Sequence, residues 1–436
     1  NSKYSNGIAT GIPPGIIVAD AAAVPEKVGG GRSQWAVQSL LSNVNYSYDD
    51  RYLAQVSFRR DGASNFGNNA QYGNFFSVSG GWNIHKESFM TNLTAISNLK
   101  LRASYGQVGN AGVNPYSTQA NLINTGYDFD GTPAFGFAPQ NLANKNLRWE
   151  RSTELNLGID FGFFKNRISG TLELYNRKTE DLILNQRIPT VSGFTQVIAN
   201  VGAIENKGIE LTLNTANIVT TDFSWNTTFA FTQNKNKLLE LYGDGQLVDK
   251  GNNLFVGFPI RANFDYQFNG IWQTSEKDQA AVYKQVPGSV KVVDQNGDGI
   301  ISSTNNIDDR VYLGTQLPNW ILGVTNRFKY KNLDFSFFTY YRNGTQYRNN
   351  TLAGTFGEIG STRYNKLAGL DYWRSDNPSN TFFGVVAANP YRNAIFYQDA
   401  SFLRISDITL GYNFSPKVLS ALKMGSARIY GQVSNP

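Results

Sequence analysis

The sequence predicts an all-β protein, a transmembrane antiparallel β-barrel, on three observations. Apolar and polar side chains alternate in segments of about ten residues, the length of a tilted membrane-spanning strand. Aromatic residues make up 14% of the chain, and no run of 18 or more apolar residues is present. Short and long connections alternate between these segments, as they must when every strand crosses the same slab.

The clearest alternation lies in residues 148–176. Before a tight turn, apolar residues such as Leu157 are odd-numbered and polar residues such as Asn156 are even-numbered. After the turn, Leu172 lies on the apolar face and Thr171 on the polar face. Because successive side chains of a strand point to opposite sides of a sheet, the segment predicts a hairpin with one lipid-facing and one lumen-facing side.

The same pattern recurs along the chain. Residues 1–34 are rich in Gly and Pro and predict a long loop, and residues 85–98 predict a short amphipathic helix. About twelve strands are expected. Their cores are residues 40–48, 52–59, 76–84, 99–105, 153–161, 168–175, 209–214, 223–231, 321–330, 333–341, 408–414 and 427–433.

One segment resembles a strand but breaks the alternation of connections. Residues 264–272 would add a crossing, so we place them within a single long extracellular loop, residues 233–318. The alternative fold class is a soluble all-β sandwich or propeller, which would have shorter strands and turns of similar length at both ends. Strand length, loop asymmetry and aromatic content favour the membrane barrel.

Composition leaves little room for catalysis. The chain has no Cys, and its single His85 lies in a turn beside Lys86, so neither a thiolate metal site nor a His-based triad can be built. The net charge of +6 is spread over turns and loops, without the basic stripe that nucleic acid requires. The charged segment Arg59–Gly62 is expected at the barrel rim near lipid headgroups. We therefore predict neither an enzyme nor a nucleic-acid-binding protein.

One group of residues resembles a metal-binding site. Side-chain oxygens at Asp294, Asn296 and Asp298, then a Gly and the backbone carbonyl of Ile300, match the first half of a calcium-binding loop. The twelfth position, where a bidentate acid is expected, is Asn305. The alternative is a turn rich in Asp and Asn without metal.

Aromatic residues concentrated in the loops are the remaining feature with recognition chemistry. Such rings stack on sugars or cover peptide side chains, and they equally hold loops together or contact a second protein. They do not identify a substrate-binding residue. The residues are Tyr127, Phe129, Phe135, Phe137, Tyr372, Trp373, Tyr391, Phe396 and Tyr397.

Six motifs resemble TonB-dependent outer-membrane transporters of the SusC/RagA type, in the order of that family. They are SFRRDGASNFG (57–67), LKLRASYGQVGN (99–110), LRWERSTELNLGIDFGFF (147–164), NVGAIENKGIELTLN (200–214), DQNGDGIIS (294–302) and DASFLRISDITLGYNF (399–414). The resemblance implies that residues 1–436 are the C-terminal part of the barrel, about 12 of about 22 strands. It also implies a plug domain and a last strand that this chain lacks, and that Asp309 with Arg310 closes the calcium-like loop.

The resemblance further implies active import of an oligosaccharide or peptide across the cell outer membrane. Expected partners are a SusD-like lipoprotein lid and the TonB-ExbB-ExbD complex, which acts through the missing N-terminal part. Calcium is the expected cofactor, with a structural role. Two alternatives remain: a passive porin or barrel adhesin, and a secreted calcium-dependent glycan-binding protein.

Overall fold

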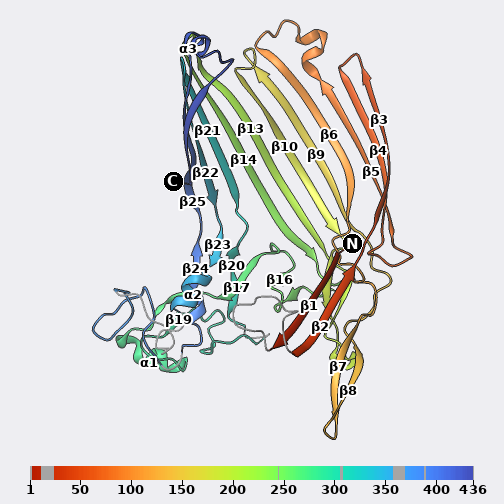
Figure 1. Ribbon diagram of the computed structural model, residues 1–436. Helices are drawn as coiled ribbons and strands as arrows, with labels where there is room; N and C mark the ends of the chain where they lie inside the picture. Colours follow the sequence, from red (N-terminus) through yellow and green to blue (C-terminus); the bar gives the residue numbers. More distant parts are fainter. Residues whose placement is uncertain are drawn as a thin grey trace.

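The computed structural model describes residues 2–10, 24–243, 245–304, 308–356, 369–386 and 389–435. Twelve strands form one curved antiparallel wall in the order β26-β25-β22-β21-β14-β13-β10-β9-β6-β5-β4-β3 (Figure 1). All twelve predicted strands lie in this sheet. They are β3 (Val37–Tyr48), β4 (Tyr52–Ala63), β5 (Tyr72–Asn83), β6 (Ile96–Asn110), β9 (Glu150–Phe163), β10 (Ile168–Glu180), β13 (Ala203–Val219), β14 (Phe223–Glu240), β21 (Trp320–Tyr330), β22 (Leu333–Asn343), β25 (Phe402–Asn413) and β26 (Arg428–Ser434).

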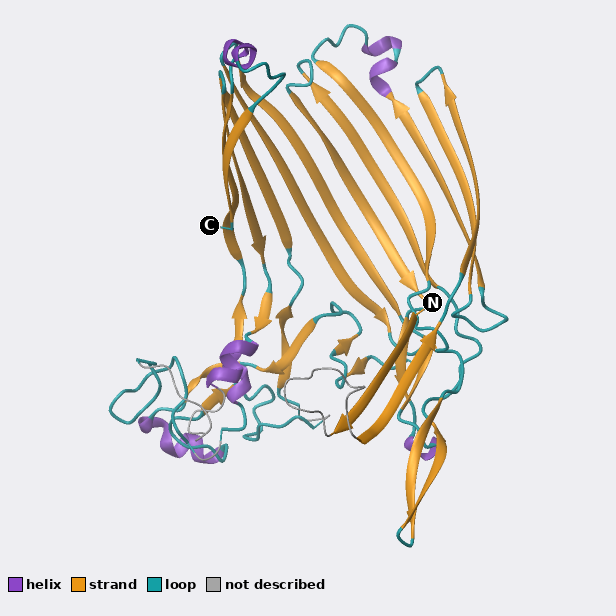
Figure 2. Ribbon diagram, in the orientation of Figure 1, coloured by secondary structure: helices purple, strands orange, loops and turns teal. Residues whose placement is uncertain are grey.

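Connections at one end of the wall are mostly tight turns, and those at the other end are mostly long (Figure 2). The exceptions are residues 84–95 and 414–427 at the turn end, which are longer than residues 64–71 at the other end. The turn between β3 and β4 shows how the short ones close. Asp49 and Asp50 have φ of 53° and 51°, and the Arg51 N–H donates to the Tyr48 carbonyl at 3.0 Å. This is a type I′ turn, whose twist matches that of the flanking strands, and Asp tolerates the left-handed conformation.

The two faces of the wall differ as the alternation predicts. On β9, Leu155 and Leu157 are each 47% exposed on the outer face, and their polar neighbour Asn156 faces inward. The register of β9 with β10 places Leu157 opposite Leu174, and Asn156 opposite Tyr175. A sheet with one apolar and one polar face fits a barrel with lipid outside and an aqueous lumen inside. None of the helices in the described residues is long and apolar enough to cross a membrane.

The long connections form what we call the loop crown: residues 64–71, 111–149, 181–202, 241–319 and 344–401. It contains six short two-stranded pieces outside the wall. These are β7 (Leu122–Phe129) with β8 (Thr132–Pro139), β11 (Ile183–Arg187) with β12 (Gln196–Asn200), β15 (Val248–Asp249) with β16 (Leu254–Phe255), β17 (Ala262–Tyr266) with β20 (Arg310–Thr315), β18 (Phe268–Ile271) with β19 (Val290–Val292), and β23 (Gln346–Arg348) with β24 (Tyr397–Asp399).

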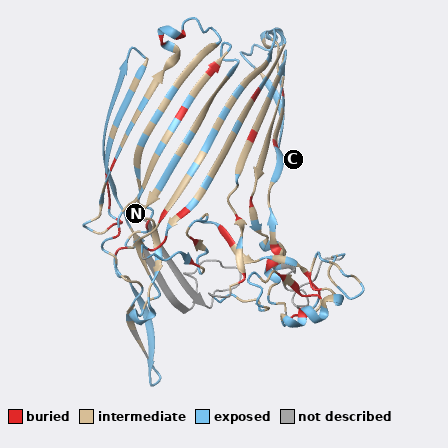
Figure 3. Ribbon diagram, turned by 180° about the vertical axis from the view of Figure 1, so that it is seen from behind, coloured by how far each residue is buried: buried red, intermediate tan, exposed pale blue. Residues whose placement is uncertain are grey.

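The crown also contains helices α1 (Lys277–Val282) and α2 (Asn350–Phe356), and α3 (Pro416–Ala421) lies at the opposite end, between β25 and β26. Buried residues concentrate where the crown folds on itself (Figure 3). The largest buried cluster joins two loops through six side chains, with Tyr266, Trp373 and Tyr391 packed around it. The six are Ile271, Val290, Val292, Phe383, Ala394 and Phe396.

Three expectations about the connections need correction. Residues 2–10 and 24–33 are not loop, because β1 (Ser2–Thr10) pairs with β2 (Val24–Ser33). The Gly- and Pro-rich composition hid this pairing, in which backbone groups bond each other whatever the side chains. Residues 264–272 do lie outside the wall, as predicted, but the loop that holds them begins at residue 241, since β14 continues to Glu240.

The predicted helix at residues 85–98 is wrong. Two 3-10 turns, Ile84–Lys86 and Ser88–Met90, stand there, separated by Glu87 in an extended conformation. The Glu87 carboxylate accepts hydrogen bonds from Arg51 at 3.0 Å, Tyr52 at 2.7 Å and Trp82 at 2.9 Å. These tertiary bonds hold the connection against β4 and β5 and interrupt a helix.

Candidate functional site: lumen wall and loop crown

The inner face of the wall carries a charged network at mid-strand. The Arg102 guanidinium on β6 donates to both Asp160 oxygens on β9, at 3.0 and 2.9 Å, and to Glu173 on β10 at 2.9 Å. Gly158 makes room for this arrangement, because a Cβ there would lie 2.8 Å from the Arg102 guanidinium carbon. One arginine thus links three neighbouring strands and presents charge to the lumen.

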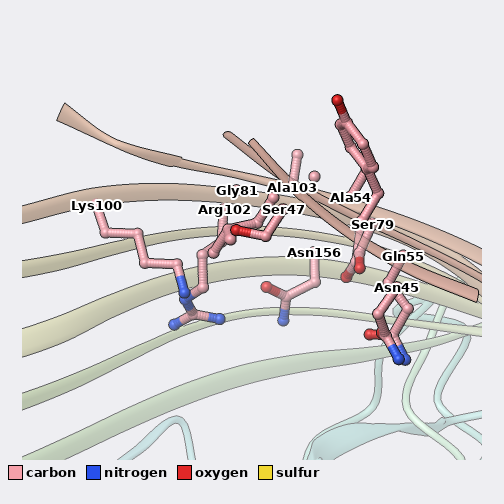
Figure 4. A pocket seen from close by; sticks show the side chains of 14 residues that line it. Asn45, Ser47, Ala54, Gln55, Ser79, Gly81, Lys100, Arg102, Ala103 and Asn156 are labelled. Carbon is pink, nitrogen blue, oxygen red and sulfur yellow. The ribbon is translucent and has the colours of Figure 1, made fainter. Parts of the chain in front are cut away.

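A hollow of about 530 Å³ lies beside this network on the inner face. Lys100, Arg102 and Asn156 point to the same side of the sheet (Figure 4). Lys100 stands opposite Asp160 in the register, and the described residues hold no carboxylate within 4.0 Å of it. Small and polar side chains complete the lining, among them Asn45, Ser47, Gln55, Ser79, Gly81 and Ser104. The hollow offers hydrogen bonds and positive charge to a polar solute or to a protein segment in the lumen.

Sequence reasoning missed this network, although its members were visible on the polar face of the hairpin. The alternation assigns even-numbered residues before the turn, such as Asp160, and odd-numbered residues after it, such as Glu173, to the lumen face. Their partner Arg102 could be found only from the pairing of β6 with β9, a register that no local pattern sets.

The predicted calcium loop is folded around its acidic side chains. Asp294 accepts hydrogen bonds from the N–H groups of Gly297 at 2.7 Å and Gly299 at 2.8 Å. Asp298 accepts one from the Ile300 N–H at 2.8 Å and one from the Asn296 amide at 3.0 Å. Gly297 and Gly299 have φ of 72° and 79°, a conformation that glycine adopts without strain.

Asp309 closes the loop through hydrogen bonds, and its expected role as a calcium ligand stays a prediction. Asp309 is fully buried, and its two oxygens accept hydrogen bonds from the N–H groups of Gln295 at 2.9 Å and Ser302 at 2.7 Å. Burial would raise the pKa of Asp294, but the N–H groups of Gly299 and Gly297 outweigh it, and the pKa lies below its ordinary value. The Asp294 carboxylate is therefore ionised at neutral pH, as a calcium ligand must be.

The side chains of the loop do not form a complete set of calcium ligands in this geometry. Among the described residues, no group of three or more His, Cys, Asp or Glu side chains converges at metal-binding distance. Asn305, the twelfth position, lies outside the described residues. The arrangement is that of turns closed by Asp and Asn side chains, and the calcium site stays a prediction.

Seven of the nine loop aromatic residues fall into two groups. The Phe135 side chain lies outside the described residues, and the Tyr372 ring contacts the Arg374 guanidinium at 5.4 Å. Phe396 is 1% exposed in the crown core, and the Tyr397 hydroxyl donates to Asp265 at 3.0 Å. Burial and the adjacent carboxylate of Asp265 raise the pKa of Tyr397. With Trp373 and Tyr391 packed on the same cluster, this group holds the crown together.

The second group is exposed on the β7–β8 hairpin. Tyr127 is 65% exposed, Phe129 63% and Phe137 74%. A two-stranded hairpin without a covering layer is only marginally stable in water, and exposed apolar patches mark interaction sites. This hairpin is therefore the part of the crown that a second protein would cover.

His85 and Arg59–Gly62 have structural surroundings. The His85 ring nitrogen Nδ1 lies 3.2 Å from the Leu99 carbonyl oxygen, in the connection that the sequence predicts to be a turn. At the crown end of β4, Arg59 bonds Asp61 at 2.7 Å, and the Arg60 guanidinium lies 4.9 Å from the centre of the Tyr72 ring. That Arg60 meets lipid headgroups stays a prediction.

A twelve-stranded antiparallel wall with an apolar outer face, a polar inner face, short turns at one end and a crown at the other defines an outer-membrane β-barrel. The chain belongs to the TonB dependent receptor-like β-barrel family, whose model matches residues 6–435. This is a family of receptors and not of enzymes, and its place is the outer membrane. The secreted glycan-binding alternative and the soluble all-β alternative are therefore wrong.

Similar proteins support this assignment. TonB-dependent receptor P26 of Formosa agariphila is 34% identical over 91% of this chain and 41% of its own length. TonB-dependent receptor SusC of Bacteroides thetaiotaomicron is 29% identical over 91% of this chain and 40% of its own length. A solved structure of the RagAB peptide transporter superposes with a TM-score of 0.80 at 24% identity, over 97% of this chain and 46% of that one. The chain thus spans about two fifths of the length of the curated relatives it matches.

Proposed function

We propose that the protein to which this wall belongs imports a large nutrient, an oligosaccharide or a peptide, across the outer membrane. The observation that carries the proposal is the polar inner face, with its charged network and hollow, in a wall that matches TonB-dependent receptors over nearly its whole length. The chemistry is binding and passage, without a covalent step. A solved RagAB peptide importer, 25% identical over 96% of this chain, supports the peptide class.

Import is driven by the TonB-ExbB-ExbD complex, acting through a plug domain of the full-length protein. The lumen wall supports this part of the proposal, because Lys100 and the partly exposed Arg102 network offer a plug charged groups that can be bonded and released. A passive porin is the competing function, since a polar lumen alone would also conduct small solutes.

A SusD-like surface lipoprotein closes the barrel from outside. The exposed β7–β8 hairpin supports this partner, because its aromatic side chains need a cover. Purification of the tagged full-length receptor should co-isolate such a lipoprotein, and the triple variant Tyr127→Ser, Phe129→Ser, Phe137→Ser should lose it. The control Phe89→Ser changes an equally exposed ring at the opposite end of the wall and should keep it.

Uptake by the native bacterium tests the transport proposal. Labelled oligosaccharides and peptides are offered to cells that carry the full-length receptor, with and without ExbB. Accumulation of one substrate class that disappears when either the receptor or ExbB is deleted is the expected result. Uptake that needs the receptor but persists without ExbB would show a passive porin instead.

A further inference from the structure

Two hollows adjoin on the outer face of the wall, along β6, β9 and β10. The first, about 610 Å³, is mostly apolar and is lined by residues that include Leu101, Ala103, Leu157, Ile159, Leu172 and Leu174. The second, about 410 Å³, is polar and is lined by Tyr105, Gln107, Arg151, Thr153, Leu155, Asn176, Lys178 and Glu180. Most of this lining lies on the outer face, although Leu53 and Arg102 line both the first hollow and the hollow on the inner face. The second hollow shares no residue with the inner one.

The strand register shows that the two hollows are continuous. Leu157 lies opposite Ala103 on β6 and Leu174 on β10, within the apolar hollow. Two residues nearer the crown, Leu155 lies opposite Tyr105 and Asn176, within the polar hollow. The groove therefore runs from the apolar belt toward the crown and changes from apolar to charged along its length.

Beyond the polar hollow the charged end continues as a row of basic side chains on β13 and β14. Lys207 stands directly opposite Lys235, and Lys237 stands opposite Glu205. Like charges directly opposite each other destabilise a strand pair. A cluster that keeps this repulsion on a surface beside lipid points to an anionic ligand.

The local carboxylates do not neutralise the row. Lys178 pairs with Glu180 at 2.7 Å, and Lys207 with Glu205 at 2.9 Å. Within the described residues, no carboxylate lies within 4.0 Å of the charged groups of Arg151, Lys235 or Lys237. Glu240 also lies near Lys178. The row keeps more positive than negative charge when all three carboxylates are counted.

We infer that this groove binds a phosphate-bearing lipid of the outer leaflet of the outer membrane. The phosphates lie along the basic row, one against Arg151 and Lys178 and one against the Lys235–Lys237 pair, and an acyl chain fills the apolar hollow. Charge complementarity and the order of the hollows favour a lipid over two other ligands. An acidic protein would leave the apolar hollow uncovered, and a free phosphate ion has no apolar part to fill it. The crown faces outward in such barrels, which places the charged end at the outer leaflet.

Binding of lipid A to the purified full-length receptor tests the inference. The receptor in detergent is titrated with lipid A that carries two phosphates, with phosphate-free lipid A and with phosphatidylcholine, and bound lipid is counted by native mass spectrometry. Phosphorylated lipid A should bind at least tenfold more tightly than either other lipid. Each basic residue removed should weaken it about fivefold, the contribution of one lysine near an anionic lipid surface.

The variants separate headgroup from acyl contacts. K235Q/K237Q and R151Q/K178Q should each lose affinity for phosphorylated lipid A, and Ala103→Phe, which fills the apolar hollow, should lower the affinity for all three lipids. The matched control K417Q/K423Q removes two exposed lysines from the opposite rim, and Leu410→Phe enlarges an exposed apolar residue on β25. Both controls should bind like the parent.

Three results would overturn the inference. One is equal binding of phosphorylated and phosphate-free lipid A. Another is equal loss in K417Q/K423Q and K235Q/K237Q, which would show general attraction to charge. The third is full displacement of the lipid by inorganic phosphate, which would show an ion site without a lipid. Circular dichroism of each variant checks that the barrel is folded.

Discussion

The wall and the loop crown are built on opposite principles. Of the nine largest fully buried side chains among the described residues, eight lie in the crown, and the ninth is Leu238 at the end of β14. The wall has almost no core of its own, and its outer leucines stand near half exposure. The wall depends on strand pairing and on lipid, whereas the crown depends on packing between loops that are distant in sequence.

Because of this difference, the wall and the crown should be destabilised by different kinds of substitution. A wall strand loses stability when its edge is unpaired or its outer face becomes charged, because hydrocarbon offers no hydrogen bonds. A crown loop loses stability when a buried side chain is truncated or a buried ion pair is broken, as in a soluble domain.

The largest effect is expected when the wall is taken alone. β3 and β26 are the two edges of the sheet, and in the described residues each pairs with one neighbour only, β4 and β25 respectively. Residues 1–436 expressed by themselves should therefore not yield a folded, monodisperse species in detergent, because unpaired edge groups cannot be satisfied in hydrocarbon. Gel filtration and circular dichroism check this expectation, and a stable folded monomer would contradict it.

The next effect concerns the crown core. Phe396→Ala should destabilise the crown by about 3–5 kcal/mol, because the side chain is fully buried and leaves a cavity. Hydrogen exchange of the full-length receptor should rise in residues 262–301 and 389–399 and stay unchanged in β9 and β10. The exposed Val191, 95% accessible in the same crown, provides the control Val191→Ala. Equal exchange in both variants would show that the crown has no cooperative core.

The two faces of the opening hairpin should respond differently to charge. Leu157→Arg or Leu172→Arg should cost about 2–4 kcal/mol if these positions lie near the membrane midplane. Asn156→Arg and Thr171→Arg, one residue away on the lumen face, should cost much less. The measurement is reversible folding of the full-length receptor into bilayers. Similar losses on both faces would be incompatible with the assignment of lipid and lumen sides.

An ion pair at the base of the crown gives a pH-dependent test. Burial would raise the pKa of Asp308, but hydrogen bonds from Arg310 and Lys250 lower it to about 2. The pKa of Asp308 is lower in the folded than in the unfolded protein. The ionised Asp308 therefore stabilises the fold above about pH 4, and this contribution is lost as the pH falls toward 2.

Asp308→Asn should remove that pH dependence and cost about 1.5–3 kcal/mol at neutral pH, the range for hydrogen bonds to charged groups. Limited proteolysis between residues 241 and 319, followed from pH 7 to 3, measures it. Asp278→Asn, which removes a carboxylate from helix α1 in the same loop, should keep the parental pH profile. An unchanged profile in Asp308→Asn would assign the acid sensitivity to other carboxylates.

The smallest effect concerns calcium. If the loop at Asp294 binds the ion, affinity should be weak, about 10⁻⁴–10⁻³ M, since Asn305 replaces the bidentate acid. Millimolar calcium should then protect residues 294–309 from hydrogen exchange, and Asp298→Ala should abolish the protection without changing the wall. An experimental structure grown with calcium should show ligands at about 2.3–2.6 Å. A loop with the same turns and no ion would establish the metal-free alternative.

The sequence alone was sufficient to predict the strands of the wall. The two-residue period of apolar side chains identified all twelve strands and their lipid and lumen faces, because in a membrane barrel each strand faces the same two environments over its length. Strand ends were less accurate. From Thr232 to Lys237 the residues of β14 are polar, and pairing with β13 continues the strand to Glu240. The 3-10 turns around Glu87 were hidden for the same reason, since Arg51 and Tyr52, which are distant in sequence, help to hold them.

Local pattern also located the acidic loop at Asp294 and the turns that close it, because Asp, Asn and Gly act within a few residues of one another. What the tertiary structure decided is everything that depends on register and on contacts across loops. Arg102 meets Asp160 and Glu173, Lys207 faces Lys235, and Phe396 is buried with Ile271 only after strands and loops far apart in sequence are brought together. A period of two determines which side of a sheet a residue faces, but the partner it meets there depends on the alignment of another strand.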